Sequence, residues 1–151
     1  MPEVDGIWVS PLKRCRQTAE LLFPGMEQRI VPDLQECDFG DYECKTWEEL
    51  KDEEIYRAWI GGDMTITFPH GESMEHFIAR CRRGIQTVAQ EAKALGLERP
   101  AIVAHGGTWL VVMGTFGRPE RKLYDWQVKN CGGFRVSVQE NPFTLKLLEE
   151  L

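Results

Sequence analysis

Apolar and polar positions along the 151-residue chain fall into blocks that predict strands and helices in alternation. Residues 6–10 form a short apolar run that stops at Pro11, which predicts a buried strand. Residues 12–22 predict a helix after it. Residues 101–104 are apolar at every position, as in a parallel strand that is covered on both faces. This alternation predicts an α/β layered fold.

The longest predicted helix follows Ser73. Its apolar residues recur every three or four positions from Met74 to Leu95, which places one apolar stripe along roughly six helical turns. Ser73 is suited to the N-cap of this helix, and Gly96 is suited to the position just after its end. We therefore expect an unbroken helix between these two residues.

The rest of the chain predicts shorter elements. They are a strand at 28–31, a loop at 38–42, one helix over 47–60, a helix over 108–116, a second helix over 120–125, and closing strands at 133–139 and 144–148. No internal repeat or linker separates these elements. We therefore expect one domain over residues 1–151.

Charge and composition exclude several classes of protein. The chain has 18 Lys and Arg residues against 24 Asp and Glu, a net charge of −6, and no basic cluster, which argues against binding of nucleic acid. No apolar stretch approaches the length of a membrane span, and the first residues do not resemble a signal peptide. With 42% hydrophobic and 28% charged residues, we expect a globular protein in the cytoplasm.

The cysteines predict no metal site. They are odd in number and form no C-x-x-C pair, the close spacing that zinc and iron–sulfur sites need. We expect reduced thiols, none of them in a motif that would activate a nucleophile. The five residues are Cys15, Cys37, Cys44, Cys81 and Cys131.

The strongest candidate for chemistry is the turn that follows residues 101–104. His105 comes where a parallel strand ends, and open α/β sheets bind ligands at that edge. Gly106 and Gly107 let a ligand approach the backbone, and the helix that Thr108 opens would offer unpaired N–H groups to an anion such as phosphate. A histidine that only caps the sheet is the alternative. In this context we favour a functional His105.

A second strand-to-helix turn carries a hydroxyl and a guanidinium. Ser10 follows the first predicted strand, and Arg14 lies at the start of the next helix, where it could clamp a phosphoryl group. From this segment alone, an exposed surface Arg14 is an equal alternative. Arg16 lies two positions further on, so we expect it to face away from Arg14 and to be solvated.

Carboxylates in two loops complete the set of candidates. Glu36 could give a proton to a leaving alkoxide if it lies beside a phosphate site, although an acidic loop by itself is usually only solvated. Glu72 and Ser73 precede the longest predicted helix, where they could face the substrate or simply cap the helix. His70 and His76 have no ligand-like partner in the sequence, so we expect them on the surface.

Taken in order, these segments resemble the histidine phosphatase superfamily, the phosphoglycerate-mutase-like proteins. Four pieces across nearly the whole chain carry the resemblance: Ser10-Pro-Leu-Lys-Arg14 with the residues to Ala19, Leu34-Gln-Glu36-Cys-Asp-Phe-Gly40, Gly71-Glu72-Ser73 before a helix with Arg80, and Val103-Ala-His105-Gly-Gly. The short spacing between Glu36 and Gly71 is similar to the compact phosphatase branch, which includes α-ribazole phosphatase and the broad-specificity enzymes.

The resemblance implies a three-layer phosphoglycerate-mutase-like fold with a mostly parallel sheet. It also implies roles: Arg14 binds the transferred phosphoryl group, His105 hydrogen-bonds it, and Glu36 donates the proton to the leaving oxygen. Ser10 and Gly106 join the phosphate-binding residues on this interpretation. Neither a metal nor another cofactor is implied.

The chain departs from the family pattern at two points. The pattern begins with a strand ending in Arg-His-Gly, whose histidine becomes phosphorylated, and no Arg-His-Gly occurs in the 151 residues. The expectation is therefore an N-terminally incomplete domain that lacks the first strand and helix, with His105 in its supporting place and not as the nucleophile. Cys44 stands where the family has glycine, which we expect to change only a turn.

The sequence and its family resemblance leave three functions open. The first is a phosphomonoester hydrolase in a truncated reading frame, inactive alone because the nucleophile is absent. The second is a non-catalytic relative that binds a phosphorylated ligand or partner. The third, a mutase, is disfavoured by the short insertion and by the acids within residues 41–54, which would repel a polyanion.

The resemblance and the missing first strand also predict the binding partners of the chain. The ligand would be a small phosphorylated metabolite, with no nucleic acid and no membrane. Without its central first strand the domain would expose unpaired strand edges, so we expect a homodimer, a strand-exchanged dimer, or pairing with an N-terminal piece outside these residues.

Overall fold

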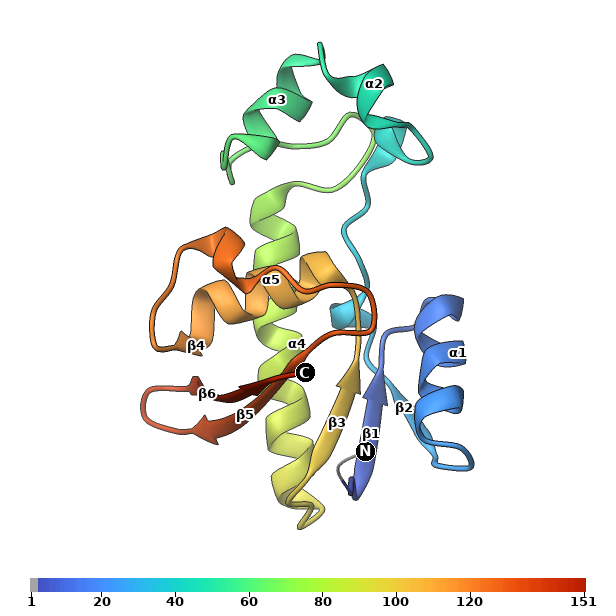
Figure 1. Ribbon diagram of the computed structural model, residues 1–151, viewed down its shortest axis with the longest axis vertical. Helices are drawn as coiled ribbons and strands as arrows, with labels where there is room; N and C mark the ends of the chain where they lie inside the picture. The colour runs from blue at the N-terminus through green and yellow to red at the C-terminus, as the bar shows by residue number, and fades with distance from the viewer. Residues whose placement is uncertain (1–2) are drawn as a thin grey trace. The chain divides into compact units, whose positions relative to one another are not determined.

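A computed structural model describes residues 3–151 of the protein (Figure 1). The helices are α1 (Lys13–Leu22), α2 (Trp47–Leu50), α3 (Glu54–Ile60), α4 (Met74–Ala94) and α5 (Gly106–Phe116). The strands are β1 (Gly6–Val9), β2 (Gln28–Ile30), β3 (Pro100–Val103), β4 (Gly117–Arg118), β5 (Phe134–Gln139) and β6 (Thr144–Glu150). No helix among these residues is both long and apolar enough to cross a membrane. The described residues form two compact units, 3–36 with 80–151 and 37–79.

The first unit contains a parallel three-stranded sheet in the order β2-β1-β3. Ile7 in the central strand β1 lies beside Gln28 of β2 on one side and Ala101 of β3 on the other. At the end of the strands, Val9 lies beside Val103. Because parallel strands end at the same edge of a sheet, the residues that follow β1 and β3 meet there.

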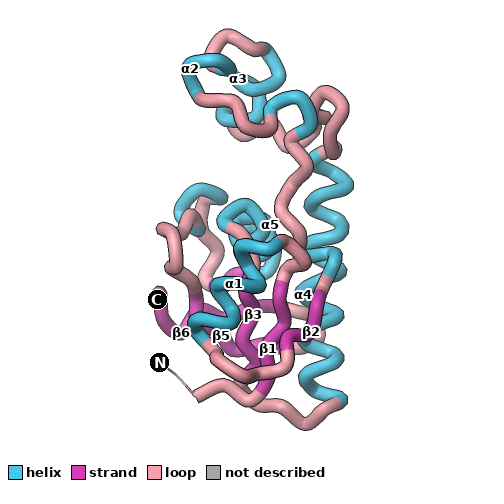
Figure 2. Tube along the Cα trace, turned by 90° about the vertical axis from the view of Figure 1, so that its right-hand side faces the viewer, coloured by secondary structure: helices cyan, strands magenta, loops and turns pink. Residues whose placement is uncertain are grey.

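Helices cover both faces of this sheet (Figure 2). On one face, Ile7 and Val9 pack with Cys15 and Ala19 of α1. On the other face, Trp8 packs with residues of α4 and with Val31 and Leu34. Alternate residues of β3 join the two clusters, since Ala101 and Val103 contact the first and Ile102 the second. The predicted layered α/β fold is therefore confirmed.

Helix α4 begins and ends where its sequence predicts. The Ser73 hydroxyl accepts a hydrogen bond from the His76 N–H at 3.1 Å, which is the N-cap contact. At the other end, the Gly96 N–H donates to the Lys93 carbonyl and the Leu97 N–H donates to the Ala92 carbonyl. With Gly96 at a φ of +68°, this is a Schellman motif.

A second three-stranded sheet in the first unit has the order β4-β6-β5. The antiparallel hairpin of β5 and β6 confirms the predicted closing strands, while the two-residue strand β4, parallel to β6, was not predicted. Helix α5 packs beside it, and Phe116 meets Phe143 edge to face with ring centroids 4.9 Å apart. Helix α5 begins two residues earlier than predicted, at Gly106.

Two helix predictions were wrong in detail. The single helix over 47–60 is two short helices, α2 and α3, which are separated by residues 51–53. The acids at 48–49 and 52–53 would stand four residues apart along one continuous helix and repel each other, which favours the break. The helix predicted over 120–125 is only a 3-10 turn at Leu123–Trp126.

The second unit is held together by aromatic rings. Phe68, which is 1% exposed, contacts three neighbouring rings edge to face, with centroids 5.1 to 5.9 Å away. Those rings belong to Phe39, Tyr42 and Trp59. Gly40 has a φ of +53°, and a Cβ there would collide with the Pro69 carbonyl oxygen, so this loop needs glycine. The predicted loop over 38–42 also contains a 3-10 turn at Gly40–Tyr42.

Replacing Cys44 with glycine should stabilise the protein. Cys44 is exposed and has a φ of +60°, in the left-handed region that side chains disfavour. We expect Cys44→Gly to raise the free energy of unfolding by about 0.5–1 kcal/mol in urea titrations, since the backbone strain is relieved. Cys44→Ala keeps the strain and should stay within about 0.5 kcal/mol of the wild type. A glycine variant less stable than the alanine variant would contradict this account.

Candidate functional site

Ser10 and His105 meet at the edge where β1 and β3 end. The Ser10 N–H continues the sheet by donating to the Val103 carbonyl at 2.9 Å. The Ser10 hydroxyl then lies 2.7 Å from Nε2 of His105. Both residues are buried, with Ser10 0% and His105 6% exposed. Two residues that are 95 positions apart in the sequence are thus joined by the parallel register of the sheet.

Arg14 contacts the other nitrogen of the same imidazole. From the first turn of α1, its Nε–H donates to Nδ1 of His105 at 3.3 Å. A guanidinium can only donate, so Nδ1 is the acceptor and a neutral ring carries its proton on Nε2. The Nε2–H then donates to the Ser10 hydroxyl. Arg14 itself is exposed, so the outer part of its guanidinium faces solvent.

The surroundings of His105 keep its ring neutral. Burial lowers the pKa of His105 to about 4, and the positive charges of Arg14 and Arg80 contribute in the same direction. Burial disfavours the charged imidazolium, and nearby cations repel it. At neutral pH the ring is therefore an uncharged hydrogen-bond donor, and an arriving anion would offset the repulsion from the two arginines.

Cys15 lies against the same ring, a contact that the sequence did not suggest. Its Sγ is 3.4 Å from Nε2 and 3.6 Å from Nδ1 of His105, and its thiol donates to the Ala104 carbonyl at 3.3 Å. Burial raises the pKa of the Cys15 thiol, so it stays protonated at neutral pH. The expectation of a reduced, inert thiol fits this environment. The position of Cys15 beside His105 depends on how α1 packs against the sheet.

The N-terminus of α5 adds backbone donors beside His105. His105 is the N-cap, and its carbonyl accepts the first helical hydrogen bond, from the Trp109 N–H at 2.9 Å. The N–H groups of the first turn have no partner within the helix and sit at its positive end. A Cβ on Gly106 would meet no atom within 4 Å, so there is open space in front of this residue.

Glu36 lies at the same helix end. A Cβ placed on Gly107 would be only 2.6 Å from Oε1 of Glu36, so the carboxylate rests against the Gly107 backbone. Thr108 is fully buried, and its hydroxyl donates to the Leu34 carbonyl at 3.4 Å. Thr108 thus holds the segment that carries Glu36, and its predicted substrate-side role stays a prediction.

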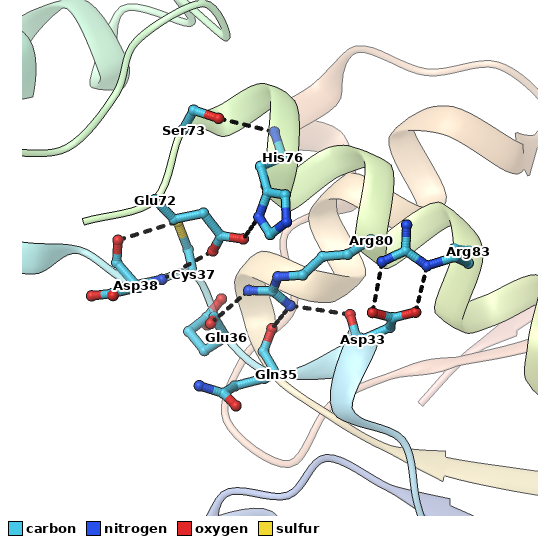
Figure 3. A network of polar contacts seen from close by, with 10 residues as sticks. All are labelled: Asp33, Gln35, Glu36, Cys37, Asp38, Glu72, Ser73, His76, Arg80 and Arg83. Carbon is cyan, nitrogen blue, oxygen red and sulfur yellow. Dashed lines mark hydrogen bonds and ion pairs between the residues drawn. The ribbon is translucent and has the colours of Figure 1, made fainter.

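Arg80 of α4 fixes the backbone that leads to Glu36 (Figure 3). Its guanidinium donates to the carbonyl oxygens of Asp33 at 3.1 Å, Gln35 at 2.5 Å and Glu36 at 2.9 Å. Arg83, one turn further along the helix, holds the Asp33 carboxylate with two hydrogen bonds of 2.8 and 2.9 Å. Arg80 is 8% exposed, and these carbonyls compensate for the loss of water around its charge.

Glu72 and Ser73 belong to the second unit, where both make local contacts. The Glu72 carboxylate accepts from the Asp38 N–H at 3.2 Å and pairs with His76 at 2.6 Å, while Ser73 caps α4. Their role toward a substrate therefore stays a prediction. His70 pairs with Asp41 at 2.8 Å. His70 and His76 are 87% and 68% exposed, which confirms the expectation that both lie on the surface.

The first unit therefore gathers Ser10, Arg14, Glu36 and His105 around the N-terminus of α5. The guanidinium, the neutral imidazole N–H and the helix end all favour a negative charge. A carboxyl group adjoins them, where it can exchange a proton with a ligand. This combination suits an anion with several oxygen atoms and a leaving group that needs a proton.

Comparisons with known proteins show the family to which the chain is similar. The family model of the histidine phosphatase superfamily (branch 1) matches residues 2–151 of the chain. The adenosylcobalamin/alpha-ribazole phosphatase of Salmonella typhimurium is 30% identical over 149 residues, which cover 95% of this chain and 72% of that protein.

Solved structures show the same fold. The alpha-ribazole phosphatase of Shigella flexneri superposes with a TM-score of 0.74 at 26% identity, over 97% of this chain and 73% of that one. The phosphoglycerate mutase of Thermus thermophilus gives a TM-score of 0.70 at 28% identity, over 100% of this chain and 74% of that one. These likenesses bear out the phosphoglycerate-mutase-like α/β fold.

The low pKa of His105 should make stability depend on pH. The unfolded chain protonates this residue near pH 6.5, whereas the folded protein does so near pH 4. Between these values only the unfolded state takes up the proton, so stability present above pH 6.5 is lost as the pH falls. We expect this loss to be about 1–3 kcal/mol larger in the wild type than in His105→Gln, measured by urea titrations at about pH 7 and about pH 4.5. Equal losses in both proteins would show that His105 is not kept neutral.

Two neighbouring glycines give a matched test of where Glu36 lies. Gly107→Ala places a methyl group against the Glu36 carboxylate, and we expect a displaced carboxylate with a loss of less than about 1 kcal/mol in the free energy of unfolding, since the end of a flexible side chain can move aside. Gly106→Ala meets open space and should stay within about 0.5 kcal/mol of the wild type. Urea titration, with NMR of the Glu36 carboxyl carbon, measures both effects. If the Glu36 signal responds equally to both variants, the carboxylate does not rest on Gly107.

Proposed function

The chain belongs to the histidine phosphatase superfamily, and on this premise we propose that its first unit binds the phosphoryl group of a small phosphate monoester. In this proposal, Arg14 grips the phosphoryl oxygens with the solvent-facing end of its guanidinium. In the free protein the Ser10 hydroxyl accepts the Nε2–H of His105 and holds the imidazole. When the ligand binds, a phosphoryl oxygen takes the place of this hydroxyl as acceptor, and the N–H groups at Gly106 and Gly107 complete the anion site.

One observation carries this proposal: the paired contacts of His105 with Ser10 at 2.7 Å and Arg14 at 3.3 Å. These contacts assign the ring proton to Nε2 and place a permanent cation beside a neutral donor. Charge-assisted hydrogen bonds to a phosphoryl group are strong, and the guanidinium fork matches two of its oxygens. A bound dianion would raise the pKa of His105 and strengthen its N–H donor.

Glu36 is the proposed proton donor to the leaving oxygen. A nucleophile, which we propose these 151 residues do not supply, would form a bond to phosphorus as the bond to the ester oxygen breaks. The electron pair of the broken bond goes to that oxygen, and Glu36 in its acid form would supply the proton that turns it into an alcohol. The position of its carboxylate against Gly107 at the end of α5 supports this role. Arg80 keeps the segment in place through three carbonyl contacts.

The nucleophile of the family pattern is a histidine. The 151 residues contain three histidines. Of these, His105 takes the supporting place, and the exposed His70 and His76 pair with carboxylates of the second unit. We therefore propose that these 151 residues, tested as they stand, bind phosphate esters but hydrolyse them only at background rate. The non-catalytic alternative, binding without turnover, predicts the same result for this stretch.

Arg14 and Arg16 offer a matched pair for testing phosphate binding. Both are exposed arginines of α1, but only Arg14 contacts His105. In titrations with inorganic phosphate followed by NMR, we expect Arg14→Ala to weaken binding at least about tenfold and Arg16→Ala to leave it nearly unchanged. Equal affinities for the wild type and Arg14→Ala would refute the proposed site.

A phosphatase assay tests the division of roles. With p-nitrophenyl phosphate, the 151 residues should give no turnover above background. The name of the Salmonella relative makes alpha-ribazole phosphate the second substrate to try. Substantial turnover that disappears in His105→Ala would show that this assignment of roles is wrong.

A further inference from the structure

Cys15 is a buried group in the site that the proposed function does not use. It is 4% exposed and lies in the first turn of α1, directly after Arg14. Its thiol is protonated at neutral pH because burial raises its pKa, with Arg14 acting in the opposite direction and Glu36 in the same one. A protonated, enclosed thiol is a poor nucleophile. Its contribution must therefore come from packing and hydrogen bonding.

The sulfur atom packs against the face of the His105 ring. It lies at nearly equal distances from the two ring nitrogens, 3.4 and 3.6 Å. A sulfur in the ring plane at such distances from both nitrogens would overlap the ring carbon between or opposite them. It must therefore sit above the plane, while Ser10 and Arg14 occupy the two hydrogen-bonding directions within the plane.

The same thiol also holds the backbone next to the ring. It donates to the carbonyl of Ala104, the residue between the end of β3 and His105. Cys15 thus contacts both the chain that carries the imidazole and the imidazole itself. Rotation of the ring about its bond to Cβ would break both in-plane hydrogen bonds and would also carry the ring into the sulfur.

We propose that Cys15 is a positioning residue for His105, which keeps the imidazole in the orientation with Nδ1 toward Arg14 and Nε2–H toward Ser10. This inference rests on the proposed function for its consequence, since in that orientation Nδ1 holds the Arg14 guanidinium and the Nε2–H stays where a phosphoryl oxygen would replace the Ser10 hydroxyl. Without the sulfur, the ring gains room to tilt, and small losses of alignment weaken binding sharply.

The orientation of the ring can be measured in the free protein. The ¹⁵N shifts of the imidazole distinguish the two neutral tautomers, and the wild type should show His105 protonated at Nε2 alone. In Cys15→Ala we expect a mixture of tautomers and a changed pKa of His105. Cys15→Ser, which keeps a donor for the Ala104 carbonyl but fills less space over the ring, should lie between them. Cys81→Ala removes a buried thiol of α4 and should leave the His105 signals unchanged.

Titration with inorganic phosphate gives the second measurement. We expect Cys15→Ala to raise the Kd about fivefold to tenfold and Cys81→Ala to leave it unchanged, even if both lose similar stability. A purely structural Cys15 would lower stability but leave the tautomer and the Kd as in the wild type, and that result would overturn the proposal. If Cys15→Ala does not fold, Cys15→Ser decides by the same two measurements. If the wild type binds no phosphate, the proposed function fails, and the tautomer comparison still decides the role of Cys15.

Discussion

The parallel pairing of β1 with β3 is the constraint on which the candidate site depends. With Val9 beside Val103, both strands end at one edge of the sheet, and the Ser10 hydroxyl comes within 2.7 Å of the His105 ring. The helices that follow the two strands begin at the same edge. Arg14 and the N-terminus of α5 are therefore brought to the imidazole by the connections after the two strands, together with the packing of α1 against the sheet. A change of register would separate all of them at once.

Around this edge, the positive charges of two arginines act on an imidazole ring that is itself neutral. Arg14 contacts the imidazole directly, and the charge of Arg80 also disfavours its protonation. Such a cluster is costly for the isolated protein, because like charges and burial act together. The same features favour an anionic ligand. The site thus holds a positive potential that an incoming phosphoryl group would neutralise.

Local patterns predicted the regular elements well and the charged segments poorly. The apolar stripe after Ser73 and the cap residues Ser73 and Gly96 suffice for α4, because a long amphipathic helix with both ends capped has few alternatives. The stretch 47–60 shows the opposite case. Its apolar residues have helical spacing, but repulsion between acids four residues apart opposes one continuous helix, and the stretch forms two. The spacing of apolar residues takes no account of repulsion between charged side chains.

The sequence by itself determined the chemistry available to this protein: a histidine and glycines after an apolar strand, a serine and an arginine at another strand-to-helix turn, and an acidic loop, in an order typical of one family. Only the tertiary structure decided which atoms meet. The three carbonyl contacts of Arg80, the Glu36 carboxylate against Gly107 and the sulfur of Cys15 over His105 all join residues at least 44 positions apart. Such contacts depend on how helices pack across a sheet, and no local pattern of residues encodes that packing.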